Sequence, residues 1–228
     1  MLKKVTIRIA KLFAGLFLYA VGIVLTVNAS LGLAPWEVFH QGIARTINIT
    51  MGQASIGAGL IFVIINSFIG EKIGWGTLAN MLFIGIFMDI LMLNNIIPSY
   101  EGFLARLIML FIGIFVVAVA TVFYIGAGLG SGPRDGIMVA LNKKTGKSIR
   151  LIRNSIEITA LILGFLMGGH VGLGTVITSL TVGFIMQFTF KIFNFDVAVV
   201  EQRFIDDDIR HIRGLFKKEE DSSASNDS

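Results

Sequence analysis

The chain repeats itself at a spacing of 98 residues, and this duplication limits its fold more than any other feature. Residues 8–90 align without a gap on residues 106–188, with about 20 of the 83 paired positions identical. LFAGLFLYAV pairs with LFIGIFVVAV, ASLGLAP with AGLGSGP, and GWGT with GLGT. In an apolar chain, such tandem halves are typical of a pseudo-symmetric membrane bundle.

The composition indicates an integral membrane protein. The chain is 54% hydrophobic and only 15% charged, whereas soluble domains carry about 25% charged residues. Six stretches approach or exceed the roughly 17–25 residues that cross a bilayer as a helix. We place these spans at Leu12–Ala29, Ala54–Gly70, Gly76–Leu93, Leu107–Ile125, Ile152–Gly168 and Thr175–Phe193.

The first span resembles a secretory signal, because basic residues precede it and VNAS ends it. The same segment recurs inside the chain at Arg106–Gly126, where no signal peptide can lie, so we expect the first copy to be a retained helix. With six spans and a cytoplasmic N-terminus, every Lys and Arg except Arg45 and Arg106 falls on the inner side. This bias predicts that both termini are cytoplasmic.

Each repeat carries three spans, an odd number, so the second copy must enter the membrane from the opposite face. The predicted fold is an all-α membrane protein of six transmembrane helices in two inverted three-helix repeats. Residues 1–195 form a single membrane domain, with repeat one at 8–90 and repeat two at 106–188. Residues 196–228 form a cytoplasmic tail, amphipathic through Val200, Phe204, Ile209, Ile212 and Leu215 and then disordered in DSSASNDS.

Two matched connectors run from a glycine-rich turn through a proline to an acid. They are expected to lie on opposite membrane faces and to continue as short interfacial or re-entrant helices, because a proline and then an acid suit a helix start. One interpretation is a surface turn that needs glycine for a positive φ. The other is a pair of segments closing a central site, as in repeat-built transporters. The candidate substrate-binding residues here are Pro35, Trp36, Glu37, Pro133, Arg134 and Asp135.

Polar residues inside the spans are the other candidates for a substrate site. They are Asn66, Asp89, Glu157 and Gln187, the last at the position equivalent to Asp89. An ionisable group at membrane depth usually faces the bundle interior or a cavity. For Glu157 the sequence also allows an ion pair with Arg153, one helical turn away. For Asp89 an interfacial carboxyl and a substrate or proton role both stay open.

Several other functions find no support in the residues. GAGLGSGPRDG follows a membrane helix rather than a strand and lacks the GK[ST] ending, so it is not a nucleotide fingerprint. Arg134 with nearby backbone N–H groups is a weak signal for an anion such as a lipid phosphate. The two histidines of the bundle, His40 and His170, show no convergent ligand spacing, and the chain has no cysteine. We expect no metal, no cofactor, no nucleic acid partner and no enzyme activity.

The repeated pattern of a membrane helix, LGLAPWEVFHQGIA or LGSGPRDGIMVAL, and then GWGT or GLGT resembles the YczE/YyaS/YitT group of bacterial membrane proteins, most closely its YczE-like branch. The resemblance covers about residues 8–193. It implies a multi-pass protein of the bacterial plasma membrane whose activity is undefined, and it brings no catalytic residues.

The sequence favours a small transporter or permease with a site between inverted repeats. The alternative is a non-transporting scaffold or accessory factor for a membrane-associated complex, using the basic inner connector and the tail. The expected partners are the lipid bilayer and anionic headgroups at the cytoplasmic face. A small-molecule or ion substrate, a protein partner and a second copy of the chain stay open.

Overall fold

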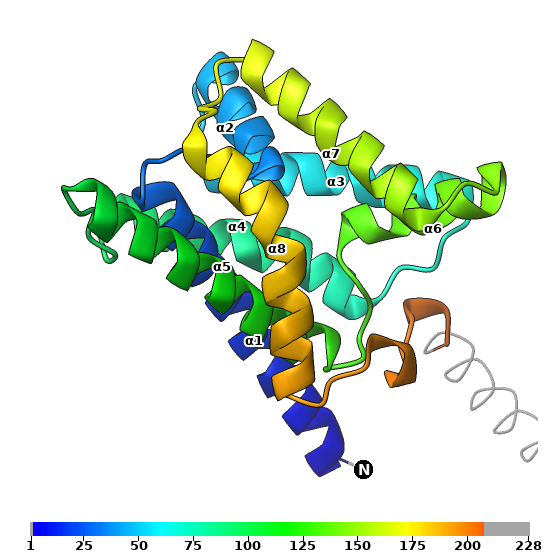
Figure 1. Cartoon of the computed structure of the whole chain (residues 1–228). Coiled ribbons are helices and arrows are strands. Elements are labelled where there is room, and N and C mark those ends of the chain that lie inside the picture. The colour runs from blue at the N-terminus through cyan, green and yellow to red at the C-terminus, as the bar shows by residue number, and fades with distance from the viewer. Residues whose placement is uncertain (1, 208–228) are drawn as a thin grey trace, which may run out of the picture.

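The computed structural model describes residues 2–207, with side chains from Val5 onward, and this part of the chain is helical without a strand (Figure 1). The elements are α1 (Leu2–Asn28), α2 (Pro35–Ile47), α3 (Met51–Ile69), α4 (Trp75–Leu93), α5 (Phe103–Ile125), α6 (Pro133–Thr145), α7 (Ile149–Leu166), α8 (Leu173–Ile192) and the 3-10 turn η1 (Val197–Val199). The six predicted spans therefore correspond to α1, α3, α4, α5, α7 and α8.

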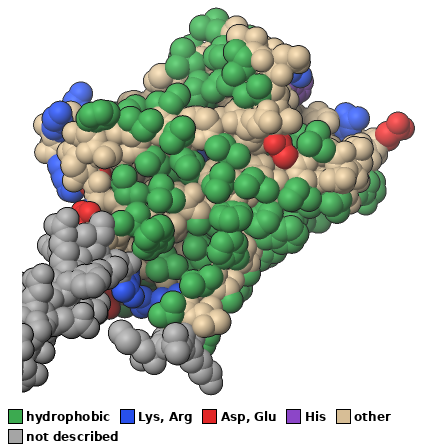
Figure 2. Space-filling view, turned by 180° about the vertical axis from the view of Figure 1, so that it is seen from behind, with side chains coloured by type: hydrophobic (Ala, Val, Ile, Leu, Met, Phe, Trp, Pro, Cys, Tyr) green, Lys and Arg blue, Asp and Glu red, His purple; other side chains and the backbone are tan. Residues whose placement is uncertain are grey.

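Five of these helices are long and apolar enough to cross a membrane: α1 from Val5, α3, α4, α5 and α8. The helix α7 has 18 residues but carries Arg150, Arg153 and Glu157 in its first half. Large apolar side chains cover the outside of the bundle. Figure 2 shows one face on which they form many patches between areas of backbone and other side chains, with Lys and Arg toward its margins. A surface of this kind suits lipid rather than water, which supports the predicted membrane class.

The central contact joins α1 to α5, the first helix of each sequence repeat. Glycines allow the two backbones to approach: a Cβ atom on Gly22 would lie 2.7 Å from Val117 Cγ2, and one on Gly113 would lie 2.7 Å from Thr26 Cγ2. Small residues permit such packing where lipid removes any hydrophobic drive between helices. Leu16 and Leu110 are fully buried on these two helices.

The remaining helices pack around this pair in corresponding ways. α4 lies against α1, and α8 lies against α5. α2 packs on α7, and α3 packs on α6, so that each short helix contacts a long helix of the other repeat. One contact departs from this symmetry: α3 packs along α4, whereas α7 does not pack along α8 in this way. In Figure 1, α7 and α8 diverge from the loop that joins them.

Each Gly-Pro loop is bonded to the start of a helix in the other repeat. The N–H of Gly76 in α4 donates to Leu129 O, and the N–H of Gly174 in α8 donates to Leu31 O, both at 2.6 Å. Each loop approaches through a glycine with positive φ, +112° at Gly32 and +110° at Gly130. These bonds satisfy N–H groups that a helix start otherwise leaves without a partner.

The loops then open the two predicted short helices, α2 and α6. Both begin at the proline, have the acid (Glu37 or Asp135) in the first turn and run for 13 residues. From the sequence we expect these helices to span Glu37–Ile47 and Asp135–Leu141, so the structure begins each one two residues earlier. Proline fits the first helical position because its missing N–H has no intrahelical acceptor there.

The described part of the C-terminal tail lies on the Gly-Pro loop of the second repeat. Arg203 N donates to Gly128 O at 2.9 Å, and Gly130 N donates to Gln202 Oε1 at 2.9 Å. The Lys72 ammonium lies 5.5 Å from the centre of the Phe204 ring. Of the predicted amphipathic tail, Ile209, Ile212, Leu215 and the closing DSSASNDS lie outside the described residues.

We predict that Gly32→Ala and Gly130→Ala each destabilise the folded protein, by more than about 2 kcal/mol. Alanine disfavours these φ values, and its Cβ would lie 2.5 Å from Gly172 N in the first case and 2.7 Å from Thr77 Oγ1 in the second. Thermal unfolding of the purified protein in detergent measures the effect. Gly57→Ala is the matched control, because no atom lies within 4 Å of a Cβ there. Equal melting temperatures for all three variants would contradict the role of the loops.

Candidate functional site

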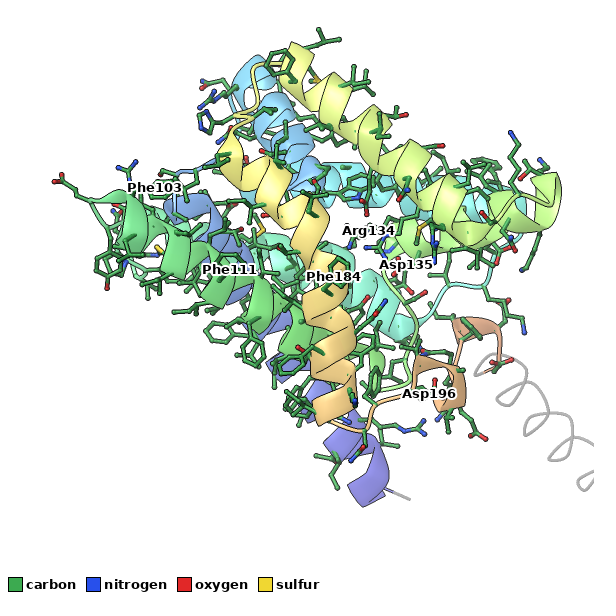
Figure 3. All side chains as sticks on the ribbon, viewed as in Figure 1. Phe103, Phe111, Arg134, Asp135, Phe184 and Asp196 are labelled. Atoms are coloured by element: carbon green, nitrogen blue, oxygen red, sulfur yellow. The ribbon has the colours of Figure 1, made fainter. Side chains whose placement is uncertain are left out.

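Polar side chains from both sequence repeats meet in the middle of the bundle, around three adjoining cavities of about 180, 90 and 80 Å³. Tyr19 of α1, Trp36 of α2 and Arg134 of α6 line all three. Figure 3 places Arg134 and Asp135 centrally, whereas Phe111 and Phe184 point outward from α5 and α8. The two Gly-Pro segments, far apart in sequence, therefore contribute to one polar space.

Trp36 and Arg134 occupy equivalent positions in the two repeats, and they contact each other. The guanidinium carbon of Arg134 lies 5.7 Å from the centre of the Trp36 ring. A cation over an indole face is attracted by the electrons of the ring, and more strongly where water is excluded. Arg134 Nη2 also reaches the Tyr19 hydroxyl at 3.4 Å, a long hydrogen bond. These contacts hold the guanidinium against the aromatic wall.

Two carboxylates share this space with Arg134. Glu37 lines the cavities of 90 and 80 Å³, and Asp135 lines those of 180 and 90 Å³. Within the described chain, ion pairs shorter than 4.0 Å form between Lys143 and Glu71 and between Arg153 and Glu157. Neither pair includes the central arginine or these two acids, so the 90 Å³ cavity is lined by one cation and two carboxylates that are not directly paired.

Burial and the charge of the central arginine both shift the pKa values of two side chains of α2. Burial raises the pKa of Glu37, and the positive charge of Arg134 partly opposes this rise. Burial and then Arg134 lower the pKa of His40 to about 4. His40 lines the 90 Å³ cavity and is therefore neutral at physiological pH, so it adds a hydrogen-bonding group and no charge.

Glu157 makes the ion pair that its sequence position allows. Arg153 Nε lies 2.9 Å from Glu157 Oε1, one turn along α7. Both side chains also face the cavities of 180 and 80 Å³. Because the pair neutralises itself, it lines the site without adding net charge.

Pro35 and Pro133 shape the edges of the site. Pro35 borders the 80 Å³ cavity, and Pro133 borders the 90 Å³ cavity. The carbonyl oxygen of Pro133 accepts a hydrogen bond of 2.6 Å from Asn66 Nδ2. Asn66 is buried, and its side chain packs against Gly136. This contact joins α3 to the start of α6. Asn66 therefore holds the backbone of Pro133 in place and lines none of the three cavities.

Asp89 and Gln187 lie away from these cavities. The Asp89 carboxylate accepts from Thr50 Oγ1 at 2.5 Å and from Gly52 N at 2.9 Å, so it caps the start of α3. A carboxylate is favourable at the positive end of a helix. Gln187 is exposed on α8. The two equivalent positions therefore differ in environment: one joins α4 to α3, and the other faces outward.

Sequence reasoning missed the two tyrosines of the site. Tyr19 comes from the second half of α1 and Tyr124 from the last turn of α5, and their rings meet edge to face at 6.0 Å. The available signal was a hydroxyl inside an apolar span, which needs a hydrogen-bonding partner once buried. Asn80 of α4 also lines the site and was missed, although it is a polar residue inside a predicted span. Met186 of α8 completes part of the wall and carried no such signal.

Comparison with known proteins identifies the family. Residues 6–191 match the profile of DUF6198, described as a family of unknown function, and the chain belongs to this family. It is similar to the uncharacterized membrane protein YczE of Bacillus subtilis, with 34% identity over 206 residues, which covers 87% of this chain and 94% of the relative.

Two further relatives agree with this assignment. An uncharacterized protein of Haemophilus influenzae is 35% identical over 184 residues, covering 81% of this chain and 84% of its own length. The uncharacterized protein YyaS of Bacillus subtilis is 24% identical over 168 residues, covering 72% and 83%. No solved structure matches the chain. The resemblance to the YczE-like branch is thus confirmed, and the protein is a membrane protein of a family without an assigned activity.

We predict that Asp89→Ala destabilises the protein by about 1–3 kcal/mol, because two donors at the start of α3 lose their acceptor. Gln187→Ala is the matched control at the equivalent position of the second repeat, where the side chain is exposed. Thermal unfolding of both purified variants provides the comparison. An equal loss of stability in the two variants would contradict a stabilising role of the Asp89 hydrogen bonds at the start of α3.

Proposed function

We propose that this protein is a small transporter of the bacterial plasma membrane, with its substrate site between two inverted repeats. The observation that supports this most is the shared polar cavity, to which both Gly-Pro segments contribute Trp36, Glu37, Arg134 and Asp135. Repeat-built transporters have their sites near the middle of the bilayer, at the interface of the repeats. Charged groups in that region are expensive and are usually functional.

The proposed topology has six spans, with α7 as the fifth. An 18-residue helix is about 27 Å long, close to the roughly 30 Å of a bilayer core. Its charged residues lie in the first half, nearest the proposed cytoplasmic end, where the long side chains of Arg150 and Arg153 can reach the interface. Apart from the central Arg134, six spans also keep every Lys and Arg except Arg45 and Arg106 on one side.

Contacts between equivalent positions support a two-fold relation between the repeats. In a two-fold interface, if position i of one unit contacts position j of the other, then j of the first contacts i of the second. The hydrogen bonds of Gly76 with Leu129 and of Gly174 with Leu31 form such a reciprocal pair. Trp36 over Arg134 is the contact expected for a position beside the axis. An inverted repeat in a membrane has its axis in the membrane plane.

The repeats differ in one respect that suggests how access alternates. α3 and α4 approach through Gly52 and Gly85, and Asp89 fastens them at the proposed outer side. At the equivalent inner side, Arg150 and Gln187 are exposed, and no atom lies within 4 Å of a Cβ on Gly183. The 180 Å³ cavity lies between these separated helices, lined by Ile156, Met186 and Phe190. This arrangement corresponds to a site open toward the cytoplasm and closed toward the outside.

A scaffold is the second candidate, favoured by the exposed basic residues of the connector between α6 and α7. Lys144, Lys147 and Arg150 are exposed there. Such a surface suits anionic headgroups or an acidic protein partner. A scaffold does not require the charged residues of the central cavity. Flux measurements on variants of those residues therefore separate the two functions.

The topology is testable with single cysteines, because the natural chain has none. We expect His170→Cys and Ser99→Cys to react with a membrane-impermeant maleimide in intact cells, and Lys144→Cys to react after the cells are opened. Six spans place residue 170 outside, whereas a chain in which α7 does not cross places it inside. Labelling of His170→Cys in opened cells alone would therefore overturn the six-span arrangement. All three positions are exposed.

Transport is testable in proteoliposomes with a panel of labelled small solutes. We expect uptake of at least one solute above that of empty liposomes, and a fall of about tenfold or more with Glu37→Gln or Arg134→Gln, as for loss of a hydrogen bond to a charged group. Lys144→Gln, on the exposed side of α6, is the control and should transport normally. Uptake that never exceeds that of empty liposomes, or that is unchanged by both central variants, would favour the scaffold.

A further inference from the structure

We propose that the ligand of the central cavity is a small zwitterion with an apolar group, of the class of large neutral α-amino acids. The inference rests on the proposed transport function and specifies the substrate of the same site. Its carboxylate would bind the Arg134 guanidinium, its ammonium would bind the carboxylates of Glu37 and Asp135, and its apolar group would enter a neighbouring hydrophobic chamber.

The charged groups of the cavity favour a ligand that has both a positive and a negative charge. Arg134 contacts Trp36 and Tyr19 and has no carboxylate within 4.0 Å in the described chain. Glu37 and Asp135 likewise lack a cation at that distance. All three residues line the same 90 Å³ space. A charge removed from water is costly unless it is paired, so opposite charges that share a cavity without pairing favour a ligand that presents both signs.

The geometry of the two short helices keeps these charges apart. Glu37 and Asp135 each lie in the first turn of a helix that begins at a proline, so their backbones are fixed by α2 and α6. The guanidinium is held against the Trp36 ring. An arginine fork matches a carboxylate with two parallel hydrogen bonds, and an ammonium donates to carboxylate oxygens. A zwitterion can therefore bridge groups that the fold keeps separate.

A hydrophobic chamber defines the third part of the ligand. A cavity of about 320 Å³ shares Trp36 and Arg134 with the polar space. Most of its other walls are apolar or aromatic, formed among others by Phe39, Phe62, Ile137 and Leu163, and Ser155 and Thr159 add two hydroxyl groups. This volume far exceeds the roughly 15 Å³ that one water needs, and an apolar wall offers water few partners. The chamber accordingly suits a branched or aromatic side chain attached to the charged head.

The test is binding to the purified full-length protein by isothermal titration calorimetry with four probes. L-Leucine presents both charges and an apolar group, glycine lacks the apolar group, 4-methylpentanoate lacks the amine, and 3-methylbutylamine lacks the carboxylate. We expect L-leucine to bind at least about tenfold more tightly than each of the other three. The two singly charged analogues leave a charged group of the site without its partner, and glycine buries no apolar group in the hydrophobic chamber.

Substitutions of the lining residues test whether L-leucine binds in this cavity. Glu37→Gln and Arg134→Gln should each weaken L-leucine binding by about tenfold or more. Phe62→Ala should weaken the binding of L-leucine but not that of glycine. Phe68→Ala is the matched control, because this phenylalanine lies on the same helix with 88% of its surface exposed. Melting temperatures show whether each variant is folded, and the four-probe comparison on the natural chain does not depend on them.

The outcomes separate this inference from the transport function. Tighter binding of 3-methylbutylamine than of L-leucine would overturn the zwitterion in favour of a cation, and tighter binding of 4-methylpentanoate would do so in favour of an amphipathic anion such as a fatty acid. Absence of binding by all four probes, with uptake of another solute in proteoliposomes, would overturn the ligand class and retain the transporter. Binding of L-leucine without uptake of any solute would retain the ligand class and reject transport.

Discussion

The two halves of this protein are joined by hydrogen bonds between loops and helix starts, and the rest of the arrangement depends on them. A membrane bundle must satisfy every backbone polar group without help from lipid. The Gly-Pro loops are irregular backbone, and the starts of α4 and α8 carry free N–H groups. Each half supplies hydrogen-bonding partners to the other: Gly76 N donates to Leu129 O, and Gly174 N donates to Leu31 O. The same contact points α2 and α6 toward each other, and with them the residues that line the cavity.

Much of this arrangement could be predicted from the chain alone. Hydrophobic runs located the helices, since the apolar length needed by a bilayer is a strong constraint, and proline followed by an acid located the starts of α2 and α6 within two residues. The pairing of Arg153 with Glu157 followed from helical spacing. That α7 crosses stays a prediction, because this helix carries Arg150, Arg153 and Glu157 and is not among the five helices that are long and apolar enough to span a membrane.

Other features depend on contacts that local patterns do not contain. Asp89 looked like a candidate for the site, yet its carboxylate caps a helix that precedes it in the chain. Asn66 was also a candidate for the site, yet its amide donates to the carbonyl oxygen of Pro133 and does not line the cavities. Tyr19 and Tyr124 belong to the site because α1 and α5 cross where these rings lie. A polar residue in a span signals that a partner exists, but the packing of the helices decides which partner it is.

The contact between Trp36 and Arg134 has a consequence for the history of the chain. Under the proposed two-fold arrangement, these residues are one repeat position seen twice. In a dimer of identical three-helix subunits, that position would meet its own copy, and arginine would face arginine. Two positions that mutate separately exist only after the gene is duplicated. An arginine that faces a tryptophan at this repeat position is therefore something that a duplicated chain can have and a dimer of identical subunits could not.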